Sequence, residues 1–127
     1  MLVALTVMRD IEAIFKEIEN VPDFMGQKIE SISCKNSYGD SPLHIVSNWG
    51  DCEAIEVLIS AGADIDAKGE SGFTPLHCAV EQNKPAAVLK LLYLGAKVLK
   101  NDDGETPLEL AELLKNTEVV NALVQNI

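Results

Sequence analysis

Histidines and cysteines are the residues of this 127-residue chain whose side chains most often act as nucleophiles or metal ligands. The two histidines, His44 and His77, stand in similar stretches, SPLHIVS and TPLHCAV, that lie 33 residues apart. The three cysteines, Cys34, Cys52 and Cys78, form no C-x-x-C pair, and the histidines form no H-x-x-x-H pair. Because such close pairs mark zinc sites in a sequence, this spacing argues against a bound metal.

Motifs of catalysis are also missing. A nucleophile needs an oriented base, and acid–base chemistry needs carboxylates positioned in a pocket. The chain contains no G-x-S-x-G, P-loop or G-x-G-x-x-G motif. We therefore predict no enzymatic activity and no cofactor. An enzyme or metal protein is the alternative, which a zinc assay of the pure protein would reveal.

The charge of the chain is strongly acidic. Lys and Arg together number 10 and Asp and Glu 20, so the formal net charge is −10. Nucleic-acid binding needs a basic face, which argues against that class of partner. The charge favours a basic protein partner or simple solubility. An odd number of cysteines without close pairing is typical of a reducing compartment, and we expect a cytoplasmic protein.

The apolar start of the chain, MLVALTVM, does not match a targeting segment. It lacks a basic beginning, and no A-x-A cleavage site follows it. No apolar stretch of the chain approaches the length of a membrane span. The sequence therefore predicts neither a signal peptide nor a membrane protein.

The histidine stretches belong to a longer pattern that occurs three times and determines where helices begin. It can be aligned on Pro42, Pro75 and Pro107, each preceded by Ser or Thr and followed by Leu. A Ser or Thr hydroxyl caps the free N–H groups of a first helical turn. Proline suits the first helical position, where its missing N–H costs nothing. The pattern predicts a short helix beginning at the same place in each copy.

A second helix is predicted in each copy, and a further helix precedes the first copy. Apolar residues at helical spacing indicate helices over residues 52–61, 85–94, 117–125 and 8–20. Glycines follow two of these segments, as is typical of helix ends. Residues 21–29 fit no copy and are interpreted as an irregular insertion. In this insertion we expect Phe24 and Met25 to extend the surface, whereas we expect Tyr93 to pack between helices.

A period of about 33 residues with this cap-Pro-Leu-His pattern resembles the ankyrin repeat. The stretch GADIDAKGESGFTPLHCAV matches the family pattern over 19 residues. The resemblance implies an all-α solenoid of stacked helix-turn-helix pairs with short β-hairpin or turn fingers. It implies that His44 and His77 join neighbouring repeats by hydrogen bonds. The chain departs from the pattern at Ser41, Glu109 and Lys115, which bears on local turn geometry and not on the fold.

The resemblance also implies how the chain is divided. We expect a single domain over residues 1–127, with a capping helix and insertion in 1–29 and repeats in 30–61, 62–94 and 95–127. The last repeat is expected to cap the stack with a polar face, as terminal repeats often do.

The family binds proteins through its finger tips and the exposed side of each first helix. By register, five positions in each copy map to that concave face, and these fifteen contain six carboxylates and no Lys or Arg. A random draw from this composition would give about two or three acids and one base. They also include the only tryptophan. From them we predict a protein-binding face, called here the predicted face, made of Tyr38, Asp40, Asn48, Trp49, Glu70, Phe73, Glu81, Asp102, Asp103 and Glu105.

The predicted face leads to a functional hypothesis. Aromatic anchors within a charged surround are what protein interfaces use for energy and specificity. We predict a non-catalytic module that binds a basic protein, with an inhibitor resembling bacterial immunity proteins against toxins as one version. A general adaptor that bridges proteins is the alternative, and the acids could also serve solvation alone. We expect a monomer when free, because a self-contact would bring six like charges against six more.

Overall fold

The structure is a computed structural model and describes residues 9–24 and 27–127. Within these ranges the chain forms helices and turns but no β-strand. The helices, in chain order, are α1 (Ile11–Glu19), the 3-10 helix η1 (Pro22–Phe24), α2 (Pro42–Trp49), α3 (Cys52–Ser60), the 3-10 helix η2 (Glu70–Gly72), α4 (Pro75–Glu81), α5 (Pro85–Tyr93), α6 (Pro107–Leu113) and α7 (Thr117–Asn126).

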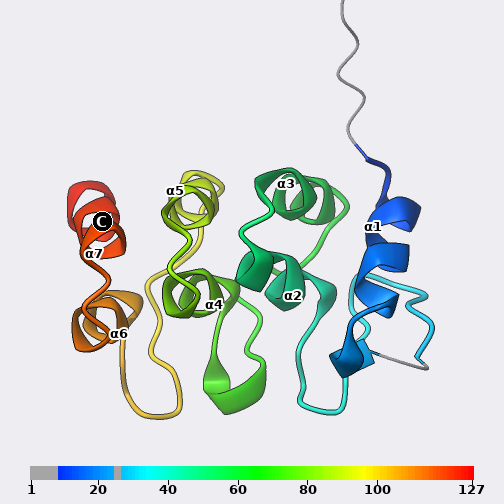
Figure 1. Cartoon of the computed structure of the whole chain (residues 1–127), viewed down its shortest axis with the longest axis horizontal. Coiled ribbons are helices and arrows are strands. Elements are labelled where there is room, and N and C mark those ends of the chain that lie inside the picture. Colours follow the sequence, from blue (N-terminus) through cyan, green and yellow to red (C-terminus); the bar gives the residue numbers. More distant parts are fainter. Residues whose placement is uncertain (1–8, 25–26) are drawn as a thin grey trace, which may run out of the picture.

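The helices form a two-layered stack of antiparallel pairs. Helices α2, α4 and α6 lie side by side in one layer, and α3, α5 and α7 form the other (Figure 1). Helix α1 packs against α2 and α3 at one end of the row. The loops that join successive pairs all project on the same side (Figure 1). The structure thus confirms the predicted all-α solenoid.

Each first helix begins at its Ser or Thr cap, as predicted. The Thr74 hydroxyl accepts the backbone N–H of His77 at 3.3 Å, and the His77 ring accepts the backbone N–H of Thr74 at 3.3 Å. In the last pair Glu109 takes the place of the histidine, and its carboxylate accepts the N–H and hydroxyl of Thr106 at 3.3 and 3.0 Å. These hydrogen bonds lower the pKa of Glu109. The departure at this position therefore preserves the cap.

The fingers are tight turns, the second of the two forms that the resemblance implied, and no strand pairing forms in the residues described. In each finger one backbone N–H closes the turn onto a carbonyl four residues later, from Gly69 to Phe73 at 2.8 Å and from Asn101 to Glu105 at 2.9 Å. The Asn101 side chain also accepts two backbone N–H groups of its own finger. A side chain that satisfies the backbone locally replaces the pairing that a strand would need.

The capping helix packs as predicted, but Phe24 of the insertion behind it does not lie on the surface. Ile14 and Ile18 of α1 are fully buried in the core. Phe24 is only 1% exposed, so the expectation that it extends the surface was wrong. Its side chain belongs to the hydrophobic core, which the local sequence does not indicate. Met25 lies outside the residues that the structure describes.

Arg9 ties the start of the capping helix to the first repeat. Its guanidinium contacts Glu17 of α1 at 2.6 Å, and Asp51 and Glu53 at the start of α3 at 2.5 and 2.6 Å. Hydrogen bonds to these carboxylates raise the pKa of Arg9 above its usual value. A planar guanidinium suits such multiple contacts, because its donors point in several directions.

The turn inside each helix pair passes through a residue with a left-handed backbone. Gly50, Asn83 and Lys115 occupy this place, with φ of 73°, 53° and 60°. Glycine adopts this conformation without strain, asparagine tolerates it, and lysine does so at a cost. We expect Lys115→Gly to raise the free energy of unfolding by about 0.5–1 kcal/mol, measured by urea denaturation. Asn83→Gly is the matched comparison and should gain less; a loss of stability in Lys115→Gly would contradict the expectation.

Candidate functional site

The two histidines join neighbouring repeats, as the resemblance implied. The Nε2–H of His44 donates to the carbonyls of Ala67 and Phe73, both at 2.9 Å. The Nε2–H of His77 donates to the carbonyl of Glu105 at 2.9 Å. Burial lowers the pKa of both rings, which favours the neutral form. Both rings are fully occupied with structural hydrogen bonds, and this leaves neither free for chemistry.

The predicted face is spread over the fingers and the first helices, and its residues differ in exposure. Tyr38 is 54% exposed and Trp49 is 37% exposed. The remaining carboxylates other than Asp40 are exposed, except Glu105, which is half-buried like Asn48 and Phe73. The ring of Phe73 also packs against the core and lies 5.3 Å from the ring of His77. Phe73 therefore takes part in the core as well as in the predicted face.

Asp40 is the residue that differs most from its expected placement. Its register predicts an exposed position, but it is only 8% exposed. Its Oδ1 accepts the backbone N–H of Glu70 at 2.9 Å, so it joins the first finger to the second. The absence of a side chain at Gly69 permits this approach, because a Cβ there would lie 2.1 Å from Oδ1. Sequence reasoning missed this role, since the two partners are 30 residues apart.

One hollow brings half of the predicted face together. It lies between the first two repeats, has a volume of about 220 Å³, and is called here the α2–α4 hollow. Tyr38, Trp49 and the residues of the third finger do not line it. Its lining consists of Asp40, Asn48, Glu70, Ser71, Phe73, Cys78 and Glu81.

The carboxylates of the α2–α4 hollow affect a buried thiol that lines it. Cys78 is buried, and the loss of solvation raises its pKa. The charges of Asp40, Glu81 and Glu70 raise it further. A thiol held in its neutral form is a poor nucleophile and a poor metal ligand. Within the described residues no group of three or more His, Cys, Asp or Glu side chains is placed to hold a metal ion.

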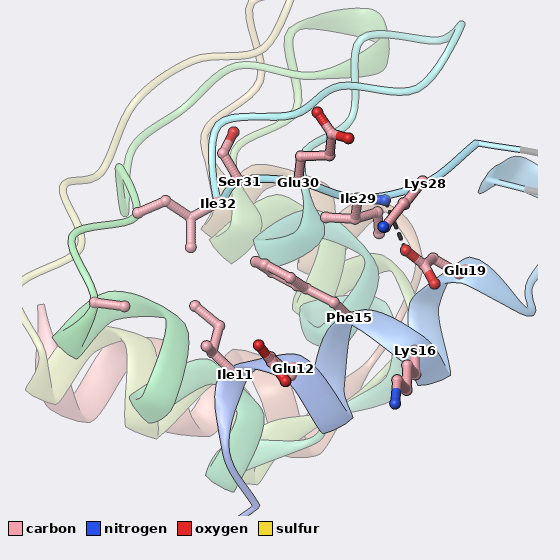
Figure 2. Close-up of a pocket in the computed structure, with 11 residues that line it drawn as sticks. Ile11, Glu12, Phe15, Lys16, Glu19, Lys28, Ile29, Glu30, Ser31 and Ile32 are labelled. Carbon is pink, nitrogen blue, oxygen red and sulfur yellow. Dashed lines mark hydrogen bonds between the residues drawn. The ribbon is translucent and has the colours of Figure 1, made fainter.

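A larger hollow of about 620 Å³ lies between α1 and the segment of residues 28–32. Phe15 projects into it between Ile11 and Ile32, while Glu12 and Lys16 lie on its rim (Figure 2). The backbone N–H of Ile29 donates to the Glu19 carboxylate at 2.7 Å and fixes the segment to the helix (Figure 2). Sequence reasoning missed this hollow because residues 21–29 fit no repeat. Its rim carries both acidic and basic side chains, so its charge does not indicate an acidic or a basic ligand.

Large apolar side chains are also exposed elsewhere on the stack. Tyr93 of α5 is 85% exposed, so the expectation that it packs between helices was wrong. Leu113 and Leu114, at the end of α6, are exposed as well and occupy the same register as Asn48 and Trp49. Among the residues described, no helix is both long enough and apolar enough to cross a membrane.

A row of helix pairs joined through buried histidines, with a broad open face of finger tips and first helices, defines a repeat protein of the interaction type. The chain belongs to the ankyrin-repeat family: the family model described as ankyrin repeats (3 copies) matches residues 11–102. Ankyrin repeats mediate contacts between proteins, and the chain shares this general function.

Several curated animal proteins are similar to the chain. Human "Protein phosphatase 1 regulatory subunit 27" is 34% identical over 110 residues, which cover 80% of this chain and 71% of that protein. The mouse protein of the same name is 33% identical over 76% of this chain and 63% of its own length. Rabbit "Ankyrin repeat and SOCS box protein 5" is 38% identical over 67% of this chain, but the match spans only 26% of that protein.

Proposed function

We propose that the protein is a non-catalytic regulatory or adaptor module that binds a basic protein partner with the predicted face. The observation that carries this proposal is the pairing of exposed aromatic side chains, Tyr38 and Trp49, with exposed carboxylates on neighbouring fingers and helices. Aromatic residues supply binding energy at interfaces. A face that carries charges of one sign speeds and orients docking to a partner surface of the opposite sign.

The names of the relatives support a regulatory role. One relative is named as a regulatory subunit of a phosphatase and another as a protein that combines ankyrin repeats with a SOCS box. None of the relatives described above is named as an immunity protein or a toxin inhibitor. The toxin-inhibitor hypothesis therefore stays a prediction from charge and resemblance, and we favour the regulatory version.

The test is a double substitution at the exposed aromatics. The partner is first captured from a lysate of the source cell with the tagged protein, eluted stepwise with salt and identified by mass spectrometry. We then expect Tyr38→Ala combined with Trp49→Ala to weaken its affinity at least about thirtyfold in calorimetry, because interface aromatics often contribute 2 kcal/mol or more.

A control variant separates the face from exposed aromatics in general. Tyr93→Ala removes a more exposed aromatic from α5, outside the predicted face, and should leave the affinity within about twofold. Equal losses in the two variants, or no loss in the double variant, would show that the predicted face is not the binding surface. A neutral partner that resists salt would contradict the basic-partner part of the proposal.

A further inference from the structure

The hollow between α1 and residues 28–32, called here the α1 hollow, is large enough to take a segment of chain. Its volume of about 620 Å³ lies within the roughly 300–1,000 Å³ of ligand sites in proteins. Phe15 projects into it between Ile11 and Ile32 (Figure 2). These three side chains pack against the core but are only half-buried. The fold therefore leaves apolar surface uncovered at the α1 end of the stack (Figure 1).

The charges of the α1 hollow lie on its rim and favour an uncharged occupant. The charged lining residues are Glu12, Lys16, Glu19, Lys28 and Glu30. None of the ion pairs found among the described residues involves any of the five. Because acidic and basic side chains are mixed, the rim has no field of one sign that would attract a charged ligand. An apolar segment can cover the centre of the hollow while the charged ends of the rim side chains stay in water.

The start of the chain has the chemistry that the α1 hollow requires. Residues 1–8, MLVALTVM, contain no charged side chain, and all except Thr6 are apolar. They lie outside the residues that the structure describes. The described chain begins at Arg9, only two residues before Ile11 of the hollow. The ion pairs of Arg9 with α1 and α3 fix the point at which residues 1–8 join the fold.

Residues 1–8 are also long enough to reach the whole hollow. The lining follows α1 from Ile11 to Glu19, and these nine helical residues extend about 13.5 Å. Eight residues of extended chain span about 26–29 Å. So short a tether gives an effective concentration in the millimolar range, an advantage that a separate molecule lacks. We propose that the α1 hollow is the docking site of residues 1–8 of the same chain.

Docking of residues 1–8 covers the apolar surface that α1 leaves open. It removes the half-buried side chains of Ile11, Phe15 and Ile32 from water, which stabilises the α1 end of the stack. The α1 hollow shares no residue with the predicted face, so the inference does not depend on the function proposed above. The chain then covers this end by itself and leaves the predicted face open to a partner.

Nuclear Overhauser effects (NOEs) in the full chain test the contact directly. In protein labelled with ¹³C, we expect NOEs from the methyl groups of Leu2 and Leu5 to the ring of Phe15 and the methyl groups of Ile32. These side chains lie far apart in the sequence, so only docking brings their protons together. The absence of NOEs between residues 1–8 and the hollow would overturn the proposal, and so would NOEs to a different surface instead.

Two variants show whether the α1 hollow itself holds the segment. Ala61 is exposed at the end of α3 and lines the hollow, so Ala61→Asp places a short charged side chain against the docked segment and leaves the core intact. We expect the NOEs from Leu2 and Leu5 to be lost, because burying an unpaired charge is costly. Ser60→Asp adds the same charge to the same helix end but outside the lining, and the NOEs should remain. NOEs that persist in Ala61→Asp, or that disappear equally in both variants, would contradict docking in the hollow.

A second copy of the chain is the competing occupant of the α1 hollow. A mixture of ¹³C-labelled and unlabelled protein distinguishes the two, because isotope-filtered spectra show only NOEs between different molecules. We expect no filtered NOEs from Leu2 or Leu5 to Phe15. Filtered NOEs between these residues would assign the hollow to a second copy and overturn docking within one chain.

Discussion

Gly69→Ala is expected to lower the free energy of unfolding by about 2–3 kcal/mol. A Cβ at this position would lie 2.1 Å from Oδ1 of Asp40 and 2.9 Å from Nε2 of His44. To make room, Asp40 must leave the N–H of Glu70 or His44 must leave the carbonyls that it joins. One methyl group would therefore disturb at least one of these links between the first two repeats. Urea denaturation of the two proteins measures the difference.

A second glycine separates this clash from ordinary backbone strain. Gly69 has a φ of −106°, outside the left-handed region, so its cost comes chiefly from the contact. Gly104 has a φ of 77° and open space around the position of a Cβ, so Gly104→Ala carries only the backbone cost of about 1 kcal/mol. If Gly69→Ala costs no more than Gly104→Ala, the close approach of Asp40 is not an energetic constraint.

The sequence was sufficient for the repeated features of the fold because each rests on local chemistry. Thr74 and Pro75 mark a helix start by capping and by a fixed φ, and the helix begins there in the structure. Glu109 departs from the pattern, yet it makes the same cap with a carboxylate. The second helices end within one residue of the predicted bounds, a difference that helix ends often show.

The errors fell where burial depends on residues distant in the chain. Asp40 is a charged residue at a register position that is usually exposed. Its hydrogen-bond partner, the N–H of Glu70, lies on the next finger, so the local sequence does not indicate its burial. Phe24 stands in a segment without periodicity, and only the packing of that segment against the repeats buries it. Tyr93 was expected to pack but projects into solvent, because the stripe of α5 that faces the core consists of Ala87, Val88 and Leu91.

The candidate site was predictable in its residues but not in its shape. Register alone placed acids and aromatics on one face, since each repeat presents the same positions. That five of them surround one hollow depends on how closely two fingers approach, and no local pattern encodes this distance. The face thus divides into the five residues that line the α2–α4 hollow, Phe73 among them, and a remainder outside it that includes Tyr38, Trp49 and the acids of the third finger.

Acid is expected to destabilise the fold in the range where histidine titrates. Burial lowers the pKa of His44 and His77 in the folded protein below the usual 6.5, which they regain on unfolding. Well above pH 6.5 both states hold neutral rings, and stability does not change through these groups. As the pH falls through 6.5, the unfolded chain binds protons that the folded chain does not, so stability is lost. The loss reaches at most about 2.5 kcal/mol for two rings between pH 7 and 5.5.

Removing one ring assigns this pH dependence to its source. His77→Gln keeps a side-chain donor for the carbonyl of Glu105 but cannot titrate, so the slope of stability against pH should fall to about half. His44→Gln should do the same, and the range above pH 5.5 keeps most carboxylates ionised. Urea denaturation at several pH values gives the slope. An unchanged slope in both variants would mean that other groups take up the protons and that the inter-repeat histidines do not control the acid response.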